Sequence, residues 1–125
     1  MTEGYNATIE DGREIYIPNW PANVQFENLT KVCKVLGQDN VIAIATDKSV
    51  PVAMLAAMNA EDPELATKLI FHFVQQCRLD GDKINSSSFD SLGMSIIIEL
   101  FVNVLHSQYS DFFVSGLAKA HSQDK

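Results

Sequence analysis

The sequence predicts a mainly α-helical fold, a small helical domain preceded by an N-terminal β-hairpin. Near the N-terminus, isoleucines alternate around an Asp-Gly pair, which is typical of a tight hairpin turn. From residue 22 onwards, apolar residues instead recur at intervals of three and four, which is typical of amphipathic helices. With 125 residues, 46% of them hydrophobic, the chain is long enough to bury a core, and we expect a single domain over residues 1–125.

The expected hairpin covers about residues 7–17. Asp11-Gly12 forms its turn because these residue types tolerate positive φ, and Ile9, Ile15 and Ile17 flank the turn. An isolated hairpin is only marginally stable in water. We therefore expect it to pack against the helices or to pair with the edge of another subunit.

The first expected helix covers residues 22–36. Pro21 suits the first helical position, and Gly37 suits the C-terminal end. The run that follows, residues 40–46, is compatible with a strand or with a helix. We favour a helix because the neighbouring segments are helical.

Two further helices are expected at about residues 51–59 and 63–78. The second carries Asp62 as its N-cap, where a side-chain oxygen accepts a hydrogen bond from a free backbone N–H. Residues 79–88 then form a polar loop with a turn at Gly81.

The most apolar stretch predicts a central, buried helix at about residues 90–108, capped by Ser88 or Asp90. Ser110-Asp111 is a good capping pair, so a separate final helix is expected at about 111–121. A narrow polar stripe runs along the central helix and consists of Ser95, Glu99, Asn103 and His106.

The charge of the chain argues against nucleic acids and membranes as partners. The formal net charge is −7, and the nine Lys and Arg residues form no stripe that would contact phosphates. The longest apolar segment, residues 92–105, is too short to span a bilayer and contains polar residues.

No residue pattern predicts a catalytic, cofactor or metal site. Cys33 and Cys77 share no metal-ligand spacing, and we expect two buried thiols in a reducing compartment. The Asp-Gly-Asp segment at residues 80–82 lacks the closing glutamate of a calcium loop. The three histidines lie on separate segments: His72, His106 and His121. The sequence therefore predicts a protein without enzymatic activity.

The C-terminal segment carries more large apolar residues than the docking of one edge helix requires. These residues either dock the helix onto the core or form an exposed patch that holds a helix of another protein or subunit. The same two interpretations apply to Trp20, for which core anchoring is favoured. The candidate partner-binding residues are Trp20, Tyr109, Phe112, Phe113, Val114 and Leu117.

Five segments, taken in their order and spacing, resemble the tail assembly chaperones of tailed bacteriophages: EIYIPNW, FENLTKVCKVLGQDNV, VPVAMLAAMNAEDPELATKLIFHFV, RLDGDKI and VLHSQYSDFF. The resemblance covers nearly the full length, and none of its segments is a catalytic signature. It implies a mainly helical, non-enzymatic protein that coats the apolar, helical tape-measure protein and helps to recruit tail-tube subunits. Such a protein acts in the host cytoplasm and is absent from the mature virion.

Self-association through the hairpin edge or the last helix is also expected. Met54, Met58 and Met94 suit a surface that adapts to an apolar client, because methionine side chains are flexible. Two alternatives remain open. One is a structural tail or baseplate component that stays in the virion, and the other is a small helical enzyme or ligand-binding domain.

Overall fold

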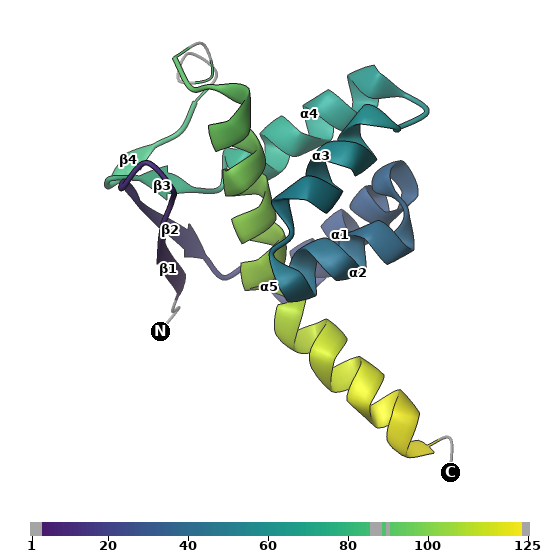
Figure 1. Ribbon diagram of the computed structural model, residues 1–125. Coiled ribbons are helices and arrows are strands. Elements are labelled where there is room, and N and C mark those ends of the chain that lie inside the picture. The colour runs from purple at the N-terminus through teal and green to yellow at the C-terminus, as the bar shows by residue number, and fades with distance from the viewer. Residues whose placement is uncertain (1–3, 86–88, 90, 124–125) are drawn as a thin grey trace.

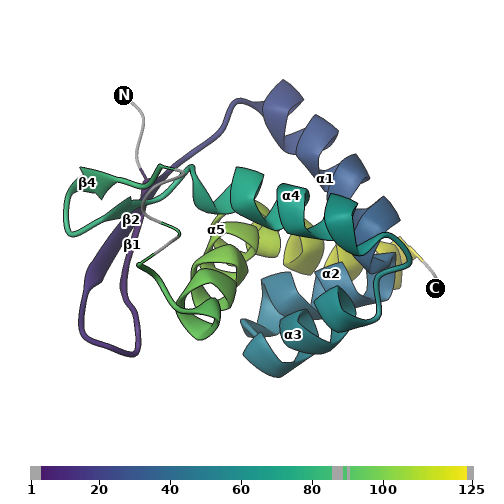
Figure 2. The same ribbon diagram turned by 90° about the horizontal axis from the view of Figure 1, so that it is seen from above.

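The computed structural model describes residues 4–85, 89 and 91–123, with side chains up to residue 116. Its main feature is a long helix, α5, that lies between a small β-sheet on one side and four shorter helices on the other (Figures 1 and 2). The prediction of a mainly α fold with an N-terminal hairpin is confirmed. The elements in chain order are β1 (Gly4–Thr8), β2 (Glu14–Pro18), α1 (Ala22–Leu36), α2 (Gln38–Asp47), α3 (Val50–Met58), α4 (Pro63–Val74), β3 (Arg78–Leu79), β4 (Asp82–Lys83) and α5 (Met94–Gln123).

The hairpin forms around the predicted Asp-Gly turn. Gly12 has φ 98°, and the Asp11 side chain accepts a hydrogen bond from the Arg13 backbone N–H at 3.0 Å. β1 and β2 pair antiparallel from Gly4 opposite Pro18 to Thr8 opposite Glu14. The hairpin prediction is confirmed, although its first strand begins three residues before the expected residue 7.

The predicted polar loop at residues 79–88 is wrong in part, because it contains β4 and half of β3. These strands extend the sheet in the order β1-β2-β3-β4, all antiparallel. Two-residue strands have no periodicity that a sequence could reveal. Asp80, in the turn between them, holds this pair of strands against β2: its side chain accepts a hydrogen bond from the Glu14 N–H at 2.9 Å, and its backbone N–H donates one to the Glu14 C=O at 2.7 Å.

The first helices follow the prediction closely. α1 has the expected bounds, and Gly37 ends it with φ 95°, but Pro21 is the N-cap rather than the first helical residue. The ambiguous run at residues 40–46 is helical, as favoured, and lies in α2. α3 begins one residue early, at Val50, after Ser49, whose hydroxyl accepts from the Val52 N–H.

The fourth helix begins as predicted and ends early. Asp62 caps α4, because its Oδ1 accepts a hydrogen bond from the Leu65 N–H at 3.1 Å. The helix stops at Val74 rather than near residue 78, and Cys77 lies in the turn that leads into β3. The pairing of Arg78 with Tyr16 requires an extended backbone there, which overrides the helical pattern.

The predicted split of the last segment into helices at 90–108 and 111–121 is wrong. α5 begins at Met94 and continues without a break through Ser110 and Asp111. An N-cap residue starts a new helix only where the chain has left the previous one, and here Tyr109 and Phe113, four residues apart, are both buried on the same face of one continuous helix. The candidate caps Ser88 and Asp90 lie outside the described residues.

α5 is the buried centre of the fold, as predicted. Phe101, Leu100, Val104 and Leu105 are fully buried, and α5 makes its most extensive contacts with α2 and α4. The polar stripe of the helix ties the hairpin to it. Glu99 accepts a hydrogen bond from the Glu10 N–H at 2.8 Å, and Asn103 accepts one from the Tyr5 hydroxyl at 3.3 Å.

Candidate partner-binding groove

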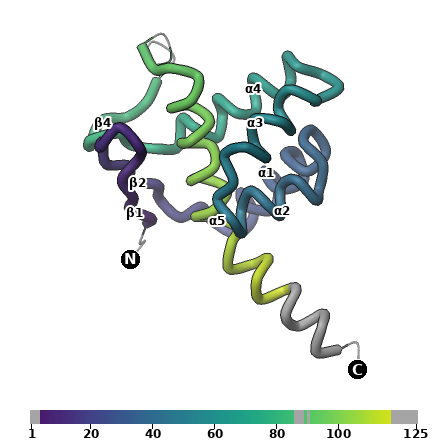
Figure 3. The backbone as a smooth tube through the Cα atoms, viewed as in Figure 1, coloured from purple at the N-terminus to yellow at the C-terminus, as the bar shows by residue number. Residues whose placement is uncertain are grey.

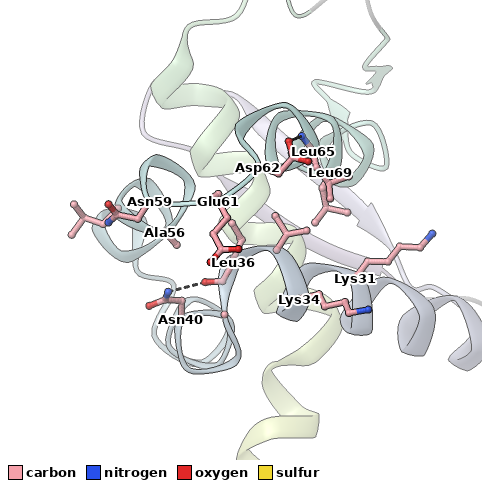
Figure 4. A pocket seen from close by; sticks show the side chains of 14 residues that line it. Lys31, Lys34, Leu36, Asn40, Ala56, Asn59, Glu61, Asp62, Leu65 and Leu69 are labelled. Atoms are coloured by element: carbon pink, nitrogen blue, oxygen red, sulfur yellow. Dashed lines mark hydrogen bonds between the residues drawn. The ribbon is translucent and has the colours of Figure 1, made fainter.

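A groove of about 760 Å³ opens on the side of the molecule formed by α1, α3 and α4 (Figure 4). Leu36 at the end of α1, Ala56 on α3 and Leu69 on α4 line it, and each of them is largely buried. The three residues come from three separate helices. The groove is therefore a product of helix packing and not of any local motif.

Exposed leucines complete the apolar lining. Leu55 on α3 is 57% exposed and Leu65 on α4 is 49% exposed. α3 also exposes Met54 and Met58, which do not line the groove, because this helix is apolar all round and buries only Ala53 and Ala56. Apolar side chains that line a concave surface and face solvent are typical of a protein-binding site.

Charged side chains of opposite sign stand on opposite sides of this groove. Lys31 and Lys34 lie on α1, and Glu61 and Asp62 lie in the turn between α3 and α4 (Figure 4). Asp62 is already engaged as the cap of α4. Within the described part of the chain, no ion pair involves either lysine or Glu61.

The sequence matches the model of a known protein family. A family model described as "Phage tail assembly chaperone protein, TAC" matches residues 11–119. The chain belongs to this family. No curated protein and no solved structure is significantly similar to the chain.

Three of the residues predicted to bind partners in this tail assembly chaperone lie in the core. Trp20 is 8% exposed and meets Phe73 and Tyr109 edge-on, with ring centroids 5.4 and 6.4 Å apart. The Tyr109 hydroxyl donates a hydrogen bond to the Gln25 C=O at 2.8 Å, and the Phe113 side chain is 9% exposed. Core anchoring, the interpretation favoured for Trp20, describes its place in the structure.

The remaining candidates are Phe112, Val114 and Leu117. Phe112 and Val114 are exposed, and the side chain of Leu117 lies outside the described residues. Phe112 borders a small depression of about 50 Å³ with Phe26 of α1, and this depression shares no residue with the α1/α3/α4 groove. Among the described side chains, the groove and the depression are therefore separate; Tyr109 and Phe112 line the depression, and none of the predicted residues lines the groove.

The groove residues Lys31, Leu55, Glu61 and Leu65 were not among the predicted site residues. The signal in the sequence was the segment VPVAMLAAM, which is apolar on every face although a short surface helix needs only one apolar face. From this segment, only Met54 and Met58 were predicted to suit a client surface.

The thiols and histidines form no site in the described residues. Burial raises the pKa of the Cys77 thiol to about 12, and it also raises the pKa of Cys33, which is only partly buried. His72 is exposed, and His106 Nδ1 lies 2.8 Å from the Ala45 C=O. Among the described residues, no three His, Cys, Asp or Glu side chains are placed to share a metal ion. None of the described helices is both long and apolar enough to span a membrane.

Proposed function

We propose that this tail assembly chaperone holds apolar helical segments of the tape-measure protein in the α1/α3/α4 groove. One observation carries the proposal: Leu55 and Leu65 expose about half of their surface in a groove whose floor is apolar. A client helix that places its own apolar face there would remove both surfaces from water. Membership of the chaperone family makes a tail protein the natural client.

The proposed binding is reversible and makes or breaks no covalent bond. Burial of apolar surface stabilises a complex by about 25 cal/mol per Å² before the costs of association are subtracted. Leucine and methionine side chains on α3 adapt to clients of different shape. We further propose that the chaperone acts in the host cytoplasm, helps to recruit tail-tube subunits and is absent from the mature virion.

Co-expression with tape-measure fragments tests the proposal. The wild-type chaperone should keep the fragments soluble and co-elute with them. Leu65→Glu should weaken this complex strongly, because it places a charge in the apolar groove. Met94→Glu is the matched control, because Met94 is 79% exposed and lies outside the groove.

Val114→Glu separates this proposal from the original candidate residues. Val114 is 58% exposed and belongs to the C-terminal segment. If Val114→Glu abolishes binding while Leu65→Glu does not, the client binds the end of α5 and the groove proposal is wrong. Mass spectrometry of mature particles addresses the location: finding the protein there would support a retained structural component instead.

A further inference from the structure

The charges around the groove carry a second inference, which rests on the proposed function. We infer that the groove selects a client helix with an acidic flank on one side of its apolar face and a basic flank on the other. The acidic flank would lie against Lys31 and Lys34, and the basic flank against Glu61 and Asp62. The occupant is thus a dipolar amphipathic helix, docked in one direction.

The lysine side is suited to this role. Lys31 and Lys34 are three residues apart, so they project from the same face of α1. Both are exposed, and neither forms an ion pair with another described residue. Their charges are therefore available to a client. Two other cations are occupied: Arg13 pairs with Asp11, and Lys48 bonds to the Tyr5 hydroxyl at 2.9 Å.

The opposite side carries the complementary sign. Glu61 is exposed and unpaired among the described residues, and one oxygen of Asp62 is left after the other caps α4. Turning a bound helix end for end exchanges its two flanks, and like charges would then face each other on both sides. Charge complementarity of this kind sets orientation and specificity more than total affinity.

Three designed helical peptides with the same apolar face test the inference. The first has one acidic and one basic flank, the second has two basic flanks, and the third has two acidic flanks. The wild-type protein should bind the first peptide roughly three- to tenfold more tightly than the other two at low salt, and less selectively at high salt. Fluorescence anisotropy of labelled peptides measures this preference.

Two variants should switch the preference. The double variant Lys31→Glu/Lys34→Glu makes both sides acidic, so it should prefer the peptide with two basic flanks. The double variant Glu61→Lys/Asp62→Asn makes both sides basic, because asparagine can also cap α4, and it should prefer the peptide with two acidic flanks. The matched control is Arg78→Glu/Lys83→Glu, which changes the net charge as much as the double lysine variant does. Both of its positions are exposed cross-strand neighbours in the sheet.

The outcomes separate the two proposals. If no peptide binds, the groove does not hold helices and the proposed function fails together with this inference. If all three peptides bind the wild type equally, or the control switches preference like the groove variants, the charge inference alone is wrong. If the groove variants change the oligomeric state measured by light scattering and leave peptide binding unchanged, a second copy of the chain occupies the groove.

Discussion

The inner and outer parts of α5 both carry large apolar side chains, but those of the inner part are mostly buried and those of the outer part are mostly exposed. Between residues 97 and 109, the helix is surrounded by the sheet and by α2, α3 and α4, and most of its side chains are buried. Between residues 110 and 116, it extends away from the other elements (Figure 3), and only Phe113 is buried. Phe101 and Phe112 are therefore the same residue type on one helix with very different roles. Burial depends on the neighbours that the fold supplies and not on the residue itself.

The largest effect is expected at the centre of the inner part. Phe101→Asp places an unpaired charge where the side chain is fully buried, and it also removes ring contacts with Phe73. We expect the loss to exceed about 4 kcal/mol, enough to unfold the protein. Circular dichroism with urea denaturation measures this. Val114→Asp is the control and should stay folded. A cooperative, folded Phe101→Asp protein would show that the inner part is not buried as described.

A smaller loss is expected where the two parts meet. Phe113 is 9% exposed and touches the rings of Tyr109 and Phe112. Phe113→Ser should lower the free energy of unfolding by about 2–3 kcal/mol, less than at a fully enclosed site. Urea denaturation checks the value. If association is weakened instead and stability is unchanged, Phe113 belongs to a partner surface rather than to the core.

The boundary between the two parts of α5 can also be tested at Tyr109, through the pH dependence of stability. Tyr109→Phe removes its hydrogen bond to Gln25 and should cost about 1 kcal/mol at pH 7. Burial raises the pKa of Tyr109 above its ordinary value of 10 in the folded state. The folded state therefore keeps the phenol proton up to a higher pH than the unfolded state does. The contribution of this protonated hydroxyl to the free energy of unfolding is complete below pH 10 and is lost as pH rises above 10. Above pH 10, the free energy of unfolding should fall less steeply with pH in Tyr109→Phe than in the wild type. An equal decline would mean that Tyr109 is accessible to water.

The smallest effect is expected in the outer part. Phe112 is 54% exposed, so Phe112→Ser should change the free energy of unfolding by less than about 0.5 kcal/mol. Thermal unfolding followed by circular dichroism is sufficient to check this. A loss comparable to that of Phe113→Ser would show that the outer part is packed. Loss of self-association without loss of stability would assign the Phe112 surface to contact between copies.

The comparison also shows where sequence reasoning succeeds. The hairpin and α1 were predicted well because Asp11-Gly12 and Gly37 act through their own backbone conformations, which need no distant partner. The end of α4 and the continuity of α5 were predicted wrongly for the opposite reason. Arg78 is extended because it pairs with Tyr16, sixty-two positions earlier in the chain, and Asp111 stays helical because Phe113 is anchored in the core.

The same distinction between local and distant causes applies to the candidate site. The sequence identified an excess of apolar residues at the C-terminus and on α3, but periodicity alone does not reveal which of them lack a covering neighbour. Leu65 and Leu69 belong to one apolar stripe of α4, yet Leu69 is 8% exposed and Leu65 is 49% exposed. The difference arises because α4 packs against its neighbours along only part of that stripe.

The sequence by itself determined the class of the fold, the turns, most helix starts and the family of this chaperone, because those depend on local backbone preferences and on the order of residues. Only the tertiary structure decided that Trp20 and Tyr109 are core residues, that α5 is continuous and that Lys31, Leu55 and Glu61 border one groove. The physical reason is that exposure and proximity are properties of packed surfaces. Residues far apart in the chain create them jointly.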